Sequence, residues 1–164
     1  RREIMVKANE LATFYLFSAF SVEQLEELAE ITEQKTYKKH THVYERGDSA
    51  KHLFVMSKGL VSLRRFDPGD QVGNAFETRE HGELFGAASF MHPQNYTLTA
   101  ICLEDTEVMA IDADKLVELC EKDPAVGYQL MLKITQIYFE RYKAAKRSLH
   151  DMVRTPTVIT ALPG

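Results

Sequence analysis

The middle of the chain is divided into short β-like segments by turn residues at nearly even spacing. Each segment is rich in β-branched and aromatic residues with polar residues between them, which is typical of strands. Between the segments lie Gly47, Gly59 and Gly69, which can adopt the positive φ angles that tight turns require. The expected strands are THVYE, HLFVMS, LVSLRRF, QVGNAFETRE, residues 96–103 and residues 107–111. So many short strands predict an antiparallel β-roll or jelly-roll barrel.

Helical patterns flank this β region on both sides. Ser21 followed three residues later by Gln24 forms a capping box ahead of an amphipathic segment. On the other side, Asp112 can cap one helix, and Asp123-Pro124 ends that helix and starts a longer one. The fold class is therefore α+β in a single domain of residues 1–152. Its expected parts are helices 3–33, β-roll 35–111, C-terminal helices 112–152 and a poorly ordered tail 153–164.

The last helix, residues 125–152, is unusually long for a domain of this size, at roughly 40 Å. Its apolar residues follow heptad spacing, although Arg141 and Ser148 occupy two of the d positions. The residues at this spacing are Met131, Ile134, Tyr138, Ala145 and Met152. We expect a homodimer through this helix; the alternative is a helix that packs only on its own roll.

Charge and hydropathy exclude several partners. The net charge is -4, whereas domains that bind nucleic acid directly usually carry a marked basic excess. No apolar run approaches the roughly 18 residues that a membrane span needs. The N-terminus lacks the pattern of a secretory signal, so a cytoplasmic location is expected. The two cysteines, Cys102 and Cys120, lie among apolar residues and are expected to be reduced.

The stretch HGELFGAASFMHPQNYTLTA, residues 81–100, has the pattern of an anion-binding loop. Glycines punctuate it before a short helical run, an arrangement that presents backbone amides to an anion. Yet from Gly82 to Thr99 it contains one acidic residue and no lysine or arginine. The loop therefore offers the backbone of an anion site without the usual cationic side chains.

The order of the elements and five segments resemble the cyclic nucleotide-binding domain family, the effector domain of catabolite-activator-type regulators. The segments are LFSAFSVEQLEELAEI, VYERGDSAKHLFVMSKGLVSL, GELFG, LEDTEVMAI and LCEKDP. The resemblance extends from Leu16 to Leu149 and implies a regulatory, ligand-sensing module rather than an enzyme. The DNA-reading relatives carry a helix-turn-helix after the long helix; the dozen or so residues after Met152 are too few for one, so direct contact with nucleic acid is not expected.

In that family the glycine-punctuated stretch is the phosphate-binding cassette. The resemblance matches Gly82, Phe85 and Gly86 to the family's Gly-x-x-Phe-Gly. Ala87 stands where the family has a ribose-binding glutamate, and Tyr96 stands where it has a phosphate-binding arginine. Losing one partner of a buried charged pair costs about 2–5 kcal/mol, or roughly 30- to several-thousand-fold in affinity. The cassette is thus expected to be degenerate, with weakened or altered nucleotide binding.

The expected ligand is a cyclic nucleotide or another small anion, and no cofactor is certain. It would be held by backbone amides and hydroxyl groups of the cassette. The expected ligand-binding residues are Phe85, Gly86, Ala87, Ala88, Ser89, Tyr96, Thr97 and Thr99.

Two other functions remain open. One is a dimerisation or protein-interaction module with an empty pocket. The other is a cupin-like metal-dependent enzyme, since His40, His42 and Glu45 lie close in sequence and the two histidines would share a strand face. The glutamate follows too closely for the cupin pattern, and no catalytic set of side chains is evident, so neither a metal site nor an enzyme is expected.

Overall fold

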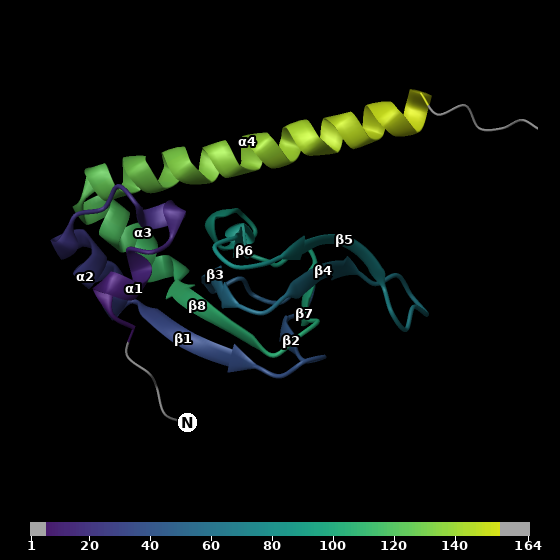
Figure 1. Cartoon of the computed structure of the whole chain (residues 1–164), viewed down its shortest axis with the longest axis horizontal. Helices are drawn as coiled ribbons and strands as arrows, with labels where there is room; N and C mark the ends of the chain where they lie inside the picture. Colours follow the sequence, from purple (N-terminus) through teal and green to yellow (C-terminus); the bar gives the residue numbers. More distant parts are fainter. Residues whose placement is uncertain (1–5, 155–164) are drawn as a thin grey trace, which may run out of the picture.

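The computed structural model describes residues 6–154 and contains two antiparallel four-stranded sheets, with the short α-helices gathered at one end and the last helix extending along the sheets (Figure 1). The sheet orders are β1-β8-β3-β6 and β2-β7-β4-β5. The strands are β1 Thr32–Tyr37, β2 His42–Tyr44, β3 His52–Lys58, β4 Val61–Arg65, β5 Asn74–Arg79, β6 Leu84–Phe85, β7 Thr99–Cys102 and β8 Thr106–Asp112. The helices are α1 Ala8–Leu11, α2 Val22–Glu30, α3 Ala113–Lys122 and α4 Pro124–Arg154, with 3₁₀ helices η1 Tyr15–Phe17 and η2 Ala87–Phe90. The predicted α+β fold with an antiparallel roll is confirmed.

Side-chain caps begin the helices where the sequence predicts. In the capping box, Ser21 Oγ accepts from the Gln24 amide at 3.2 Å while Gln24 Oε1 accepts from the Ser21 amide at 2.9 Å. Asp112 Oδ1 accepts from the Lys115 amide at 3.1 Å and starts α3. Each cap satisfies amides that a helix start leaves unpaired, so these boundaries are determined locally.

The boundary between the first helices and the roll was predicted wrongly. Helix α2 ends at Glu30 and strand β1 covers residues 32–37, whereas the sequence placed helix as far as residue 33 and the roll from residue 35. All six residues of β1 pair with β8, from Thr32 opposite Ile111 to Tyr37 opposite Thr106. The segment TEQKTY has few apolar residues, and Thr32 is its one buried residue, so its sequence does not resemble a strand.

Helix α4 also continues past its predicted end. Val153 and Arg154, assigned to the tail from the sequence, belong to this helix. The rest of the predicted tail, 155–164, and the beginning of the first predicted helix, 3–5, lie outside the described residues.

Two apolar clusters make up the core. One joins the N-terminal helices, α3 and the start of α4 to the outer face of the β1-β8-β3-β6 sheet, and includes Phe17, Leu28 and Leu116. The other lies between the two sheets and includes Tyr44 and Tyr96. The second cluster therefore contains a residue that the sequence assigned to ligand binding.

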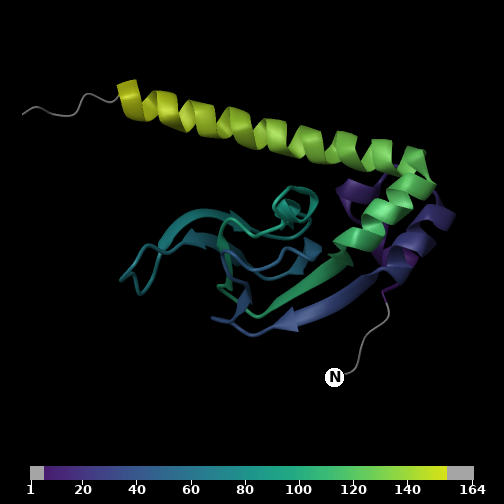
Figure 2. The same cartoon turned by 180° about the vertical axis from the view of Figure 1, so that it is seen from behind.

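The long helix α4 packs tightly only at its beginning. Val126 and Leu130 are its buried residues, and within the described chain no α4 residue after Leu130 is buried. The helix then runs along the roll, on the side where the loop between β6 and β7 lies (Figures 1 and 2). No helix within residues 6–154 is both long enough and apolar enough to cross a membrane.

Candidate functional site

The cassette begins with a tight turn that only glycine fits. Gly86 has a φ of +80°, directly after β6, and serves as the N-cap of η2. A Cβ atom here would lie 3.0 Å from the backbone oxygen of His52 and 3.0 Å from the Phe54 ring. Both the left-handed backbone and the close approach of β3 thus require glycine at this position.

Tyr96 projects into the space between the sheets and is 5% exposed. Its ring stacks on that of Tyr44, with the centroids 3.6 Å apart. Its hydroxyl donates to the backbone oxygen of His52 at 3.0 Å and accepts from the His52 amide at 3.3 Å. Burial raises the pKa of Tyr96 to about 12, so the phenol stays neutral at physiological pH. A neutral ring therefore stands where the resemblance expects a cationic arginine.

A small cavity remains between the sheets next to Tyr96, with a volume of about 170 Å³. We call it the inner cavity. It is lined by Tyr44, Leu63, Glu77, Arg79, Phe85, Gly86, Ala87, Ala88, Tyr96, Thr97, Leu98, Tyr138 and Arg141. Ligand sites for drug-sized molecules usually measure roughly 300–1,000 Å³. The inner cavity is too small for a nucleotide while Tyr96 keeps this position.

A larger space lies between the cassette and α4, with a volume of about 1000 Å³. We call it the outer groove. Cassette residues from Ala87 to Thr97 form one wall, and α4 residues from Met131 to Tyr142 form the other. Among them, Met91, Phe139 and Tyr142 are largely exposed apolar side chains. The outer groove is therefore mainly apolar and open to one side.

The structure gathers most of the predicted site residues around the inner cavity. Six of the eight line it, and the exceptions are Ser89 and Thr99. Ser89 is completely buried, and no hydrogen-bond partner for its Oγ lies among the described residues. Thr99 belongs to β7, where its hydroxyl accepts from the Arg46 amide at 3.0 Å. These two hydroxyls are thus separate from the cavity that the other six residues share.

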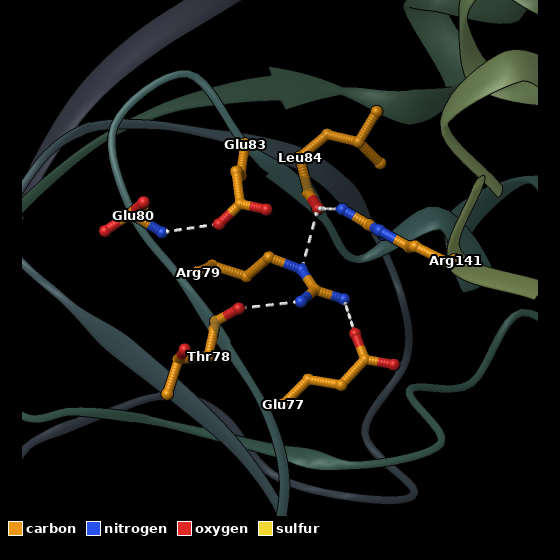
Figure 3. Close-up of polar contacts among 7 residues, drawn as sticks. All are labelled: Glu77, Thr78, Arg79, Glu80, Glu83, Leu84 and Arg141. Atoms are coloured by element: carbon orange, nitrogen blue, oxygen red, sulfur yellow. Dashed lines mark hydrogen bonds and ion pairs between the residues drawn. The ribbon is translucent and has the colours of Figure 1, made fainter. Parts of the chain in front are cut away.

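Sequence reasoning missed a cluster of charged residues that line the inner cavity, Glu77, Arg79 and Arg141, whose contacts Figure 3 shows. Arg79, at the end of β5, is 6% exposed, donates through Nε to the Leu84 oxygen at 3.2 Å, and forms an ion pair with Glu77. Arg141 of α4 donates through Nη2 to the same Leu84 oxygen at 2.9 Å. Two guanidinium groups from distant parts of the chain therefore meet at one carbonyl oxygen.

The pKa of Arg141 is lowered, first by burial and then by the positive charge of Arg79. A signal for this residue was present in the sequence, because Arg141 interrupts the heptad pattern at a d position. A charged residue in an apolar stripe commonly has a specific partner. Arg79 gave no such signal, since it ends a strand whose other residues are exposed.

The histidine motif does not form the predicted face. His40 lies in a turn with a φ of +69°, outside β2, while His42 is in β2 and its Nδ1 lies 3.1 Å from Glu45 Oε1. Across residues 6–154 no three His, Cys, Asp or Glu side chains are grouped as metal ligands.

Comparison with known proteins identifies the class. The family model described as "Cyclic nucleotide-binding domain" matches residues 34–123, which is more than half of the chain. The chain belongs to the cyclic nucleotide-binding domain family, as the sequence motifs predicted.

Two of the proteins to which this chain is similar are a cyclic AMP receptor and a transcriptional activator. The chain is similar to the cyclic AMP receptor protein of Thermus thermophilus, with 25% identity over 115 residues that cover 70% of this chain and 53% of the relative. It is also similar to the transcriptional activator protein anr of Pseudomonas aeruginosa, with 30% identity over 123 residues covering 74% and 49%. The chain thus spans about half the length of these relatives.

Solved structures agree on the fold. The sensor domain of the transcriptional regulator DNR from Pseudomonas aeruginosa has a TM-score of 0.69 at 21% identity, covering 82% of this chain and 90% of that one. A cyclic nucleotide-binding domain from Methylobacillus flagellatus has a TM-score of 0.73 at 16% identity, covering 88% and 81%. At such identities the likeness establishes the architecture and leaves the ligand open.

Proposed function

We propose that this chain is a regulatory ligand-sensing module in which conventional cyclic-nucleotide binding is weak or absent, and that it is not an enzyme. The observation that carries the proposal is the position of Tyr96. Its ring fills the space between the sheets, stacked 3.6 Å from Tyr44, and its hydroxyl is engaged by His52. A nucleotide that enters the inner cavity would have to displace this buried ring, and position 96 offers no arginine to pair with its phosphate.

The neighbouring substitution adds to this effect. Ala87 lines the inner cavity with a methyl group where the resemblance expects a carboxylate for the ribose hydroxyl. A hydrogen bond to a charged group contributes about 1.5–3 kcal/mol. Together with the missing arginine, the deficit supports millimolar or weaker affinity for cyclic nucleotides.

The regulatory output is proposed to be the position of α4. After Leu130 this helix has no buried residue in the described chain; Ile134 and Ile137 still pack against the core, and the outer groove lies between this part of the helix and the cassette. Arg141 links this part of the helix to the roll through the Leu84 carbonyl oxygen. A ligand that changes the contacts of the cassette would therefore change the contacts of the helix.

Calorimetric titration with cyclic AMP and cyclic GMP tests the proposed function. We expect dissociation constants in the millimolar range or no measurable heat of binding. A micromolar constant for either nucleotide would refute the proposal, because it would require Tyr96 to leave the cavity at little cost.

We further propose that the module acts as a homodimer through α4. The helix exposes large apolar side chains along much of its length, including Phe139, Leu149, Met152 and Val153. Such a stripe commonly marks a contact surface. In such a dimer, two sensing modules share one pair of helices. The same dimer is also compatible with the alternative function, a dimerisation module with an empty pocket.

Sedimentation equilibrium tests the dimer. Met152→Glu places a charge at a heptad a position that is 74% exposed in the monomer. It should raise the dimer dissociation constant by about tenfold or more, because a charge in an apolar seam is costly. Arg147→Glu, at an exposed position on the side of the helix away from these residues, is the control and should leave dimerisation nearly unchanged. Equal behaviour of the two variants, or a monomeric wild type, argues against this surface.

A further inference from the structure

Arg141 is a half-buried cation without an anionic partner in the described chain. Its Nη2 donates to the Leu84 carbonyl oxygen at 2.9 Å, and its guanidinium lies 4.9 Å from the centre of the Tyr138 ring. No carboxylate among residues 6–154 lies within ion-pairing distance of it. Charges removed from water are normally paired, so this arrangement lacks an anion.

The surrounding charges are already engaged elsewhere (Figure 3). Glu77 pairs with Arg79, whose Nη1 also donates to the Thr78 oxygen at 2.7 Å. The carboxylate of Glu83 accepts from the Glu80 amide at 2.9 Å. Neither carboxylate neutralises Arg141 directly, and the second guanidinium adds repulsion.

Burial and the neighbouring Arg79 both act against the charge of Arg141, and they lower its pKa in that order. An oxyanion next to Arg141 would offset both effects. The planar guanidinium also offers several N–H donors in a fork that fits a carboxylate or phosphate. The residue is therefore chemically suited to hold an oxyanion.

The space beside Arg141 determines what kind of ligand fits. Arg141 and Tyr138 line the inner cavity from α4, and Tyr44, Phe85 and Tyr96 line it with aromatic rings. Its volume of about 170 Å³ accommodates a compact body but not a nucleotide. The walls combine these rings and other apolar side chains with the charged side chains of Glu77, Arg79 and Arg141.

We propose that the inner cavity binds a small organic anion, a carboxylate or a phosphate ester, whose oxyanion pairs with the guanidinium of Arg141. This inference rests on the proposed function, since it names the ligand class of the sensing module. The ligand would contact the roll and α4 at once and so link cavity occupancy to the position of the helix.

Thermal unfolding with added ligand tests this assignment. The probes are sodium benzoate as the carboxylate, phenyl phosphate as the phosphate ester, and cyclic AMP, each compared with sodium chloride at equal ionic strength. At 100 times its dissociation constant, a bound ligand should raise the Tm by roughly 5–10 °C. Benzoate or phenyl phosphate should do so for the wild type, and the stronger of the two identifies the oxyanion.

Variants separate the proposed site from general anion effects. Arg141→Gln should weaken binding of the effective anion by about 10- to 100-fold, since it removes charged hydrogen bonds. Lys146→Gln removes the same charge from an exposed position of α4 outside the inner cavity and should leave binding unchanged. Arg141→Lys keeps a positive charge without the fork and should weaken binding several-fold. If Arg141→Gln does not fold, Arg141→Lys decides whether Arg141 holds the anion.

Each result has a distinct meaning. If neither anion stabilises the wild type, or if the position-141 and position-146 variants respond alike, the anion site is wrong while the proposed weak nucleotide binding stands. If cyclic AMP stabilises the wild type at micromolar concentration, the proposed function is wrong. In that case the benzoate and phenyl phosphate responses of Arg141→Gln still decide on the anion site.

Discussion

The inner cavity and the outer groove share the cassette as a wall but differ in size and in what surrounds them. The inner cavity has a volume of only about 170 Å³, because stacked aromatic rings occupy the space around it, and charged residues form part of its lining. The outer groove, at about 1000 Å³, is apolar and open. Under the proposed function, the comparison teaches that a family's ligand-binding architecture can persist while a single large side chain occupies its interior. It also predicts that equivalent substitutions in the two regions will change the free energy of unfolding by very different amounts.

The largest difference is expected between two tyrosines. Tyr96→Ala removes a ring that is 5% exposed and should lower the free energy of unfolding by about 3–5 kcal/mol. Tyr142→Ala removes a ring that is 57% exposed in the outer groove and should change it by less than about 0.5 kcal/mol. Urea denaturation measures both. Similar losses for the two variants would show that the outer groove is as tightly packed as the interior.

A pair of glycines compares the cassette turn with an open turn. Gly86→Ala combines a left-handed backbone with contacts of 3.0 Å to His52 and Phe54, and should cost about 2–4 kcal/mol. Gly82→Ala has nearly the same φ, +81°, but meets no atom within 4 Å, and should cost about 1 kcal/mol. Thermal or urea unfolding measures the difference. Equal costs would mean that β3 does not constrain the cassette.

A smaller effect isolates the hydroxyl of Tyr96. Tyr96→Phe keeps the stacked ring but removes the hydrogen bonds to the His52 oxygen and amide, at 3.0 and 3.3 Å. It should lower the free energy of unfolding by about 1 kcal/mol. The same variant should leave cyclic AMP binding weak, since the ring still fills the interior. Appearance of micromolar nucleotide binding would indicate that the hydroxyl, and not the ring, prevents binding.

The smallest expected effect concerns pH. Burial, followed by the charge of Lys35, lowers the pKa of His52 from its ordinary value of 6.5. Below about pH 6.5 the unfolded chain then binds more protons at this residue than the folded chain, so stability falls as the pH falls. His52→Gln should remove this part of the pH dependence between pH 7 and pH 5. Unfolding curves at several pH values measure it, and an unchanged slope in the variant would exclude His52 as the cause.

Much of the fold could be predicted because local chemistry determines it. The box of Ser21 with Gln24 and the cap at Asp112 lie where their sequences indicate, since each satisfies helix amides nearby. Strand β1 could not be found in this way. Its polar sequence becomes a strand only because β8, more than 60 residues later, supplies its hydrogen bonds.

The candidate site was predictable in its backbone but not in its charges. The glycine pattern placed the turn at Gly86, and the alignment placed Tyr96 beside it. The meeting of Arg79 and Arg141 at the Leu84 oxygen depends on how α4 lies on the roll, which no local pattern specifies. The charge of Arg141 at a heptad d position was the available clue in the sequence. Its partner, the Leu84 oxygen, could be found only from the structure.

The central claim is that Tyr96 occupies the place where the family binds its nucleotide. An electron-density map from crystals grown with 10 mM cyclic AMP tests it most directly. The account predicts that the Tyr96 ring remains stacked on Tyr44 and that no nucleotide lies between the two sheets. Continuous density for a nucleotide between the sheets, with the Tyr96 ring displaced, would contradict it.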